Sequence, residues 1–282
     1  MASLLFGLVA ALCWGLHDFL VRKVSQTAPA TTLLVLVLLF GTLFLAPFAM
    51  IESHPAGAMR GMGFAIGSGA AFVMASLGLY RAFAIGPVGL VAPICGAYPL
   101  GSLALAMAGG RTVSGSEWLA VLLVVAGIAL VAGQGGSHGA AAAGGRRQAI
   151  LWALMGAAGF ALTFHLGQTA ARVMGELSAT LIARIVALVL VSAALVVQRQ
   201  SLAPALPKWP VLALMGALDV AALGLVLASG GLTHPEYAAV SSSLFGVVTI
   251  LLAWRFLGER LGPVQGAGVA VVFAGIALLG AG

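Results

Sequence analysis

Residues 31–50 read TTLLVLVLLFGTLFLAPFAM, a run of twenty residues without a charge. The hydrocarbon core of a bilayer is about 30 Å thick, and an α-helix needs about 20 apolar residues to cross it. This run therefore predicts a membrane-spanning helix. The whole chain has the same character, since 62% of its 282 residues are apolar and only 7% are charged. A soluble domain carries about 25% charged residues, so the lipid bilayer is the expected environment.

Similar apolar runs continue on both sides of this stretch. Dividing them at charged residues and at Gly/Pro clusters gives ten predicted spans. The third and fourth spans are separated only around Gly86-Pro87, where proline and the residue before it disfavour helix and favour a tight turn. The predicted spans are residues 3–21, 31–50, 61–85, 87–107, 116–134, 149–168, 177–197, 209–230, 236–257 and 262–281.

The two halves of the chain resemble each other. At a single offset of 148 residues three features recur: AGIAL at 126–130 and 274–278, Pro87 and Pro235, and His17 and His165. Three matches in one register indicate an internal duplication. Because each copy holds five spans, the second copy enters the membrane from the opposite side. The predicted fold class is thus an all-α integral membrane protein of ten transmembrane helices, arranged as two inverted five-helix repeats.

The duplication also gives the predicted domain boundaries. The first repeat covers residues 1–134, and the second covers residues 148–282. Between them, residues 135–147 are mostly Gly and Ala and end in two arginines, as expected of a flexible linker.

Basic residues divide unequally between the connections. Nine Lys or Arg residues lie in or beside the odd-numbered connections, among them Arg22, Lys23, Arg146 and Arg147, and three lie in the even-numbered ones. Because Lys and Arg favour the cytoplasmic side, both termini are predicted to lie outside the cytoplasm. The net charge of +6 is explained by these scattered residues, and we expect no nucleic-acid partner.

Polar side chains at membrane depth are costly and therefore mark candidate sites. On the first span Trp14, His17 and Asp18 stand at i, i+3 and i+4, on one helix face. An aromatic ring, an imidazole and a carboxylate together suit a cationic or amino group, or the transfer of a proton. The alternative is that His17 and Asp18 lie near the cytoplasmic helix end and only pair with Arg22.

Further candidate site residues lie on other spans. Arg184 in the seventh span and Asp219 in the eighth are too deep to reach water, so they face protein or a water-filled cavity. They pair with each other for structure alone, or they act on a substrate. Five further polar or aromatic residues are candidates for the cavity. His165 and Gln168 lie on the sixth span, in the stripe equivalent to that of the first span. Tyr80 lies near the end of the third span, Tyr98 lies beside Pro99, and Ser242 lies within a run of serines.

Several classes of site receive no support. The chain shows no metal-ligand cluster and no nucleotide-binding motif, so neither a metal nor a cofactor is expected. Cys13 and Cys95 lie in apolar runs and predict no disulfide framework. On the last span small residues recur every fourth position from Gly262 to Ala274 and form a close-packing face. Its partner is another helix of the chain or a second protomer, which leaves a homodimer open.

Three stretches resemble EamA-type members of the drug/metabolite transporter superfamily. They are WGLHDFLVRK at Trp14 to Lys23, the Gly86-Pro87 turn, and FLGERLGPVQGAGVAVVFAGIALL at Phe256 to Leu279. The first repeat departs from the pattern, with Gly110-Arg111-Thr112 where a Glu-Arg pair is expected. The resemblance implies an exporter or exchanger of small metabolites in the bacterial inner membrane, with amino acids, including aromatic ones, among its substrates. It also implies that the fifth and tenth helices lie outside a cavity that the other eight line.

The leading hypothesis is therefore a secondary transporter that exports an amino acid or similar small metabolite by alternating access. An importer or exchanger of another polar solute is the alternative within transport. A non-transporting scaffold and an intramembrane enzyme are alternatives from other classes. The deep Arg184 and Asp219 argue against a scaffold, and no convergent nucleophile and base are found for an enzyme, so we expect a non-enzyme.

Overall fold

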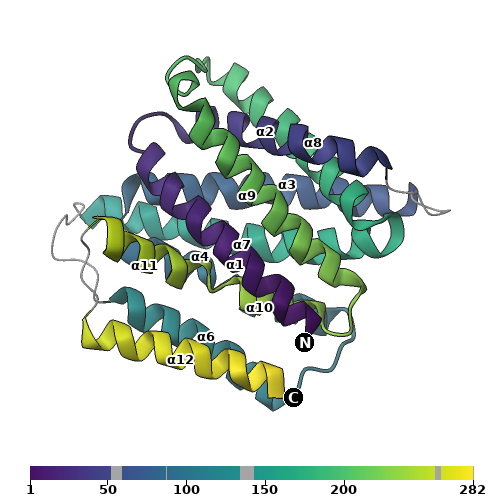
Figure 1. The fold of residues 1–282 in the computed structure, drawn as a ribbon, viewed down its shortest axis with the longest axis vertical. Helices are drawn as coiled ribbons and strands as arrows, with labels where there is room; N and C mark the ends of the chain where they lie inside the picture. Colours follow the sequence, from purple (N-terminus) through teal and green to yellow (C-terminus); the bar gives the residue numbers. More distant parts are fainter. Residues whose placement is uncertain (52–58, 87, 134–142, 258–261, 282) are drawn as a thin grey trace.

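The computed structural model describes residues 1–51, 59–86, 88–133, 143–257 and 262–281. Within these ranges the secondary structure is helical throughout (Figure 1). The elements are α1 (Ala2–Val24), α2 (Ala30–Ile51), α3 (Met59–Ile85), α4 (Val88–Gly96), α5 (Tyr98–Ala108), α6 (Gly115–Gly133), α7 (Ala143–Met174), α8 (Glu176–Val197), η1 (Leu206–Lys208), α9 (Trp209–Ala228), η2 (Ser229–Gly231), α10 (Pro235–Ser242), α11 (Phe245–Leu257) and α12 (Pro263–Ala281).

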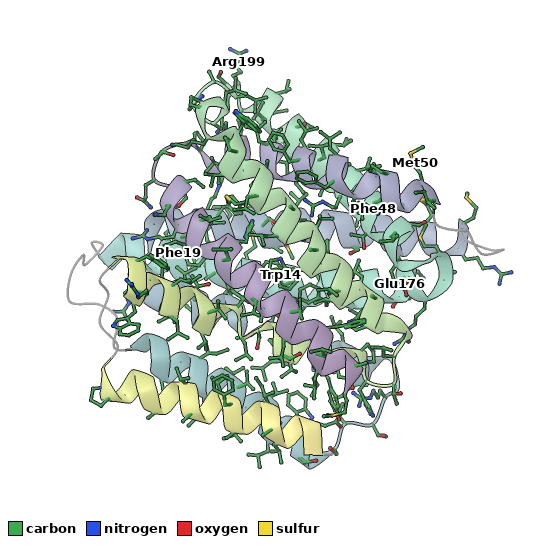
Figure 2. All side chains as sticks on the ribbon, in the orientation of Figure 1. Trp14, Phe19, Phe48, Met50, Glu176 and Arg199 are labelled. Atoms are coloured by element: carbon green, nitrogen blue, oxygen red, sulfur yellow. The ribbon has the colours of Figure 1, made fainter. Side chains whose placement is uncertain are left out.

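The distribution of side chains is that of a membrane protein. By length and composition, eight helical stretches of the described chain can cross a bilayer, and two further apolar helices are shorter. Large apolar side chains cover the outside, with Phe48 64% and Val197 82% exposed, while Asp18 is 2% and Arg184 0% exposed. Figure 2 shows Phe48 and Met50 at the outer edge of the molecule and Trp14 near its middle. Water would reverse this pattern, so the predicted all-α membrane fold is confirmed.

The fourth predicted span is present but broken in two, which the sequence analysis did not anticipate. It consists of α4 and α5, which meet at Ala97. Pro99 lies in the first turn of α5 and has no N–H to donate to the preceding turn. The amide of Leu100 instead donates to Ala97 O at 3.2 Å, a tighter bond across three residues. The break is thus explained by the missing proline donor.

The ninth predicted span is broken at the corresponding place, between α10 and α11. Here serine hydroxyls compete for the helix carbonyls. Ser242 Oγ donates to Ala239 O at 3.1 Å and Ser243 Oγ donates to Val240 O at 2.6 Å. Both interrupted helices therefore expose backbone ends in the interior of the protein, where other helices surround them.

The fifth and tenth spans, α6 and α12, form a pair along one edge of the molecule (Figure 1). A Cβ atom added to Gly127 of α6 would lie 2.7 Å from Gly268 O of α12, and one added to Gly275 of α12 would lie 2.9 Å from Ala120 O of α6. Both the glycines and their contacts are separated by the offset of the internal duplication. The seam between these helices is therefore reciprocal, as a twofold relation between the repeats requires.

The other helix pairs follow the same relation. Contacts join α3 to α7 and, correspondingly, α1 to α9, while α2 packs on α8. Both termini lie at the same end of the molecule (Figure 1). Of the segment predicted as a linker, residues 135–142 lie outside the described residues, and residues 143–147 form the start of α7. Pro87 of the predicted turn also lies outside them, and α3 ends at Ile85.

Candidate functional site

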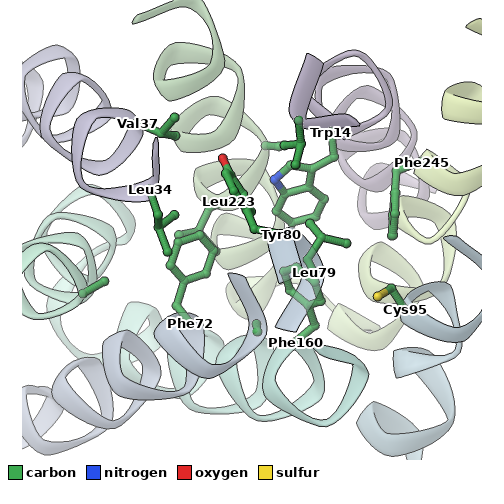
Figure 3. Packing of buried hydrophobic residues seen from close by; sticks show 14 of the residues in the cluster. Trp14, Leu34, Val37, Phe72, Leu79, Tyr80, Cys95, Phe160, Leu223 and Phe245 are labelled. Carbon is green, nitrogen blue, oxygen red and sulfur yellow. The ribbon is translucent and has the colours of Figure 1, made fainter. Parts of the chain in front are cut away.

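A cavity lies at the centre of the molecule, between the two repeats. Side chains from α1, α2, α3, α5, α7, α9 and α11 line it, and no described residue of α6 or α12 does so. Figure 3 shows Trp14, Phe72, Tyr80 and Phe160 converging there. The space between the side chains is narrow, with room for water rather than for a metabolite. The lining residues are Trp14, His17, Asp18, Leu34, Val37, Phe72, Ser76, Leu79, Tyr80, Tyr98, Phe160, Phe164, Asp219 and Phe245.

Asp219 of α9 has partners at both carboxylate oxygens. Trp14 Nε1 donates to its Oδ1 at 3.0 Å, and Arg184 Nη1 donates to its Oδ2 at 2.7 Å. Asp219 lines the cavity, whereas Arg184 stands behind it and is not part of the wall. The two residues singled out for their depth in the membrane are thus an ion pair, and Trp14 joins it from the first helix.

Arg184 is enclosed because Gly41 of α2 leaves room for its guanidinium. A Cβ atom added to Gly41 of α2 would lie 2.2 Å from Arg184 Nη2 and 2.8 Å from Gly216 O of α9. The guanidinium also approaches the ring of Phe72, at 6.0 Å from its centroid. Its Nη2 donates a long bond of 3.5 Å to Val37 O. The charge is therefore held by one carboxylate, one ring and backbone oxygen.

Asp18 is the second carboxylate of the cavity, and its surroundings differ. Its Oδ1 lies 3.0 Å from His17 Nδ1, and His17 Nε2 lies 3.2 Å from the hydroxyl of Tyr80. Its Oδ2 is buried and has no hydrogen-bond partner. Arg22 does not pair with it but donates to Phe83 O at 2.8 Å. The alternative raised from the sequence, a pair with Arg22 at the helix end, is therefore not found.

Aromatic side chains and the hydroxyl of Tyr98 complete the cavity wall. The ring of Tyr98 is stacked on Phe245, with 6.4 Å between centroids, and meets Phe164 edge-on at 5.0 Å. The Tyr98 hydroxyl lies 2.6 Å from Ser242 Oγ. This contact joins the two broken helices, because Tyr98 begins α5 and Ser242 ends α10. Tyr98 and Ser242, which the sequence offered as separate candidates for the cavity, are therefore in contact in the structure.

Besides Arg184, three residues predicted for the cavity, His165, Gln168 and Ser242, do not line it. Gln168 Nε2 donates to Ser229 Oγ at 3.0 Å and to Pro235 O at 3.1 Å, which ties α7 to the connection between α9 and α10. His165 is partly exposed on the same helix. Although His165 matches His17 in the duplication, the two repeats use these positions differently.

An ionic cluster that was not predicted from the sequence lies at the end of the molecule where the termini lie. Arg111 pairs with Glu117 at 2.7 Å and with Glu236, and its Nη2 lies 2.8 Å from His234 Nδ1. Glu117 and Glu236 lie in the first turns of α6 and α10. Arg111 lies where the first repeat departs from the EamA pattern. This departure was the feature of the sequence that could have indicated the cluster. The cluster fastens the two repeats together at one end.

These features define a class of protein: a polytopic helical membrane protein whose two inverted repeats enclose a polar site, the plan of secondary transporters. The chain belongs to the EamA-like transporter family, whose profile matches residues 1–133 and 147–281. It is therefore a multi-pass membrane transporter of small metabolites.

Comparison of structures supports the same fold. A solved crystal structure superimposes with a TM-score of 0.74 over 98% of this chain and 96% of that chain, at 16% sequence identity. A search of curated proteins by sequence gave no significant match. The family and the fold are thus assigned, and the solute has to be argued from the site.

Proposed function

We propose that this protein is a secondary transporter of the bacterial inner membrane that exports amino acids with apolar or aromatic side chains, or similar small amines. The observation that carries the proposal is that Asp18 lines an aromatic cavity and that its buried Oδ2 has no hydrogen-bond partner. A buried carboxylate oxygen is costly unless a donor or a cation meets it. An ammonium group supplies both.

The second carboxylate does not compete for this role. Both oxygens of Asp219 are engaged, by Trp14 and by Arg184. The aromatic side chains around Asp18 favour a cation as well, because the face of an aromatic ring attracts positive charge. We therefore place the amino group of the solute at Asp18, beside Trp14 and Tyr80.

Other lining residues of the cavity are complementary to the carboxylate and the side chain of an amino acid. The hydroxyl of Tyr98 is a neutral donor for a carboxylate, and it lies beside Ser242 at the break of two helices. Phe160 and Phe164 offer an apolar surface to a side chain. An apolar or aromatic amino acid therefore finds a complement for each of its three parts once the cavity widens.

Alternating access is supported by contacts that lie toward opposite ends of the molecule. At one end, Arg22 in the last turn of α1 and Gln26 just after this helix both donate to Phe83 O, at 2.8 and 3.5 Å. At the other end the Arg111 cluster joins α6 to α10. Opening one set of contacts while the other stays closed admits a solute from one side only. The outward direction follows from the resemblance to EamA-type exporters.

Uptake into liposomes that contain the purified protein tests this proposal. Labelled phenylalanine and phenethylamine, which keep the amino group, are expected to be transported, whereas phenylpropionate, which lacks it, is not. Asp18→Asn should reduce transport of both amines at least about tenfold, the loss of a charged hydrogen bond. Glu176→Gln, at an exposed position at the start of α8, serves as the matched control and should behave as the unmodified protein.

The alternatives give different results in the same assay. Transport of phenylpropionate, or of a sugar, with none of either amine would contradict the assignment of the amino group to Asp18 and favour a transporter of another polar solute. Normal amine transport by Asp18→Asn would contradict it as well.

A further inference from the structure

The cavity contains two carboxylates, and only one is compensated by a fixed charge. Arg184 and Asp219 neutralise each other at 2.7 Å. Asp18 has only the imidazole of His17 at one oxygen and nothing at the other. An isolated ionised carboxylate that is removed from water is strongly disfavoured and takes up a proton instead. The site without solute therefore requires one more positive charge than its fixed groups supply.

We propose, resting on the function proposed above, that Asp18 is the proton-carrying group of this transporter: a proton on Oδ2 in the empty site is exchanged for the amino group of the solute. Neutral His17 fits both contacts of its ring, since Nδ1–H donates to Asp18 Oδ1 while Nε2 accepts from the Tyr80 hydroxyl. A proton on Oδ2 satisfies the one carboxylate oxygen that has no donor. A proton on the imidazole would leave Oδ2 bare.

Among the described residues around Asp18, no second fixed cation could replace this proton. His17 of α1, Tyr80 of α3 and Asp219 of α9 face it, and Arg184 of α8 lies behind Asp219. Cys95 of α4 and Tyr98 of α5 are also near enough to interact with it electrostatically. The described residues that α2, α7 and α11 contribute to the wall are apolar: Leu34, Val37, Phe160, Phe164 and Phe245.

The exchange conserves charge at the site and breaks no covalent bond of the solute. The ammonium arrives at Oδ2 as the carboxyl O–H bond ionises, and the proton leaves to the side from which the solute entered. When the solute departs on the other side, Asp18 takes a proton from that side. One proton thus moves inward for each amino group that moves outward. For a zwitterionic amino acid, one net positive charge enters per cycle, so the membrane potential drives export.

Proton release on binding tests the exchange in the unmodified protein. Calorimetric titration with phenethylamine, in buffers of different ionisation enthalpy, gives the number of protons released. We expect about one proton per amine bound, and an apparent affinity that rises about tenfold per pH unit while Asp18 is protonated in the empty site. The sign follows because the proton competes with the amine at low pH. Amine binding without proton release, at an affinity independent of pH, would overturn the exchange and leave the proposed function standing.

A second measurement needs no solute and separates the two proposals. Infrared difference spectra between low and high pH should show the C=O band of a buried carboxylic acid that disappears as the pH rises. Asp18→Asn should lack this band, and Glu176→Gln should retain it. If no amine binds, the proposed function fails, and this band alone decides whether Asp18 carries a proton. A spectrum that Asp18→Asn leaves unchanged would refute the proton site.

Discussion

Arg184 is the largest side chain that the described part of the protein buries completely. An arginine at the centre of a lone membrane helix costs about 2.5–3.5 kcal/mol on insertion scales. The protein offsets this cost with Asp219 at 2.7 Å and with the space that Gly41 leaves for the guanidinium. Arg184 and Trp14 together occupy both carboxylate oxygens of Asp219, whereas one oxygen of Asp18 has no hydrogen-bond partner.

Arg184→Met is expected to destabilise the protein by about 3–5 kcal/mol, because it leaves the Asp219 carboxylate buried and unpaired. The double variant Arg184→Met with Asp219→Leu removes both charges and should largely restore the thermal unfolding temperature in detergent. We expect the restored protein to be inactive in liposomes, since Asp219 lines the cavity and orients Trp14.

Arg146→Met, at an exposed position near the start of α7, is the control and should change neither stability nor transport. A double variant that is folded and fully active would show that the ion pair serves structure alone. The transport role would then rest on the face formed by Trp14, His17 and Asp18.

At the scale of single residues, the sequence identified the polar part of the site and missed the apolar part. Trp14, His17, Asp18 and Asp219 could be selected because polar groups inside a membrane need a reason to be there. Phenylalanines such as Phe160 cost nothing on any face of a membrane helix, so their position in the wall was not predictable. Which of the polar residues contact one another could not be predicted either, because the partners lie far apart in the sequence.

Two interrupted helices, α4–α5 and α10–α11, are the elements that bring the repeats together at the cavity. They are joined by the contact of 2.6 Å between Tyr98 and Ser242. Interrupted helices are tolerated at membrane depth where neighbouring helices and side chains satisfy the freed backbone groups. Hydropathy predicted both spans correctly and not their breaks, because Ala, Ser and Gly keep the apolar run continuous through the interruption.

The α6–α12 pair is the element that stands apart from the cavity, and it permits a test of that separation. Gly127→Val should destabilise the protein by about 1–3 kcal/mol, because the added side chain meets the backbone of α12 and forces the helices apart. The affinity for phenethylamine should stay unchanged in the protein that remains folded. Thermal unfolding and calorimetry in the same detergent measure the two effects.

Gly266→Val is the matched control, because an added Cβ at Gly266 of α12 meets no atom within 4 Å. It should leave stability nearly unchanged. Loss of amine affinity in folded Gly127→Val would contradict the separation of this seam from the site.

For the whole molecule, the internal duplication predicted most of the architecture. The offset between AGIAL repeats returns in space as the reciprocal contacts of Gly127 and Gly275. Ten crossings place both termini at one end of the molecule, as Figure 1 shows. The sequence did not predict how the helices of one repeat insert among those of the other, because such contacts depend on shape at positions with similar hydropathy.

The distribution of Lys and Arg predicts which end of the molecule is cytoplasmic. Single cysteines at Gln148 and Thr112, both exposed and at opposite ends, test it after Cys13 and Cys95 are replaced by Ala. In intact bacterial cells an impermeant thiol reagent should label Thr112→Cys and leave Gln148→Cys unlabelled until the membrane is opened. The reverse pattern would invert the topology and place both termini in the cytoplasm.

Trp14 gives the site an optical signal of its own. Its indole packs against Phe164, with 5.5 Å between ring centroids, and its N–H meets the Asp219 carboxylate at 3.0 Å. The fluorescence of an indole responds to charge and polarity beside the ring, and here a solute has to enter beside it. Trp118, Trp152, Trp209 and Trp254, the other four of the five tryptophans, do not line the cavity. With phenylalanine at those four positions, the light emitted by one natural residue reports how often the cavity is occupied.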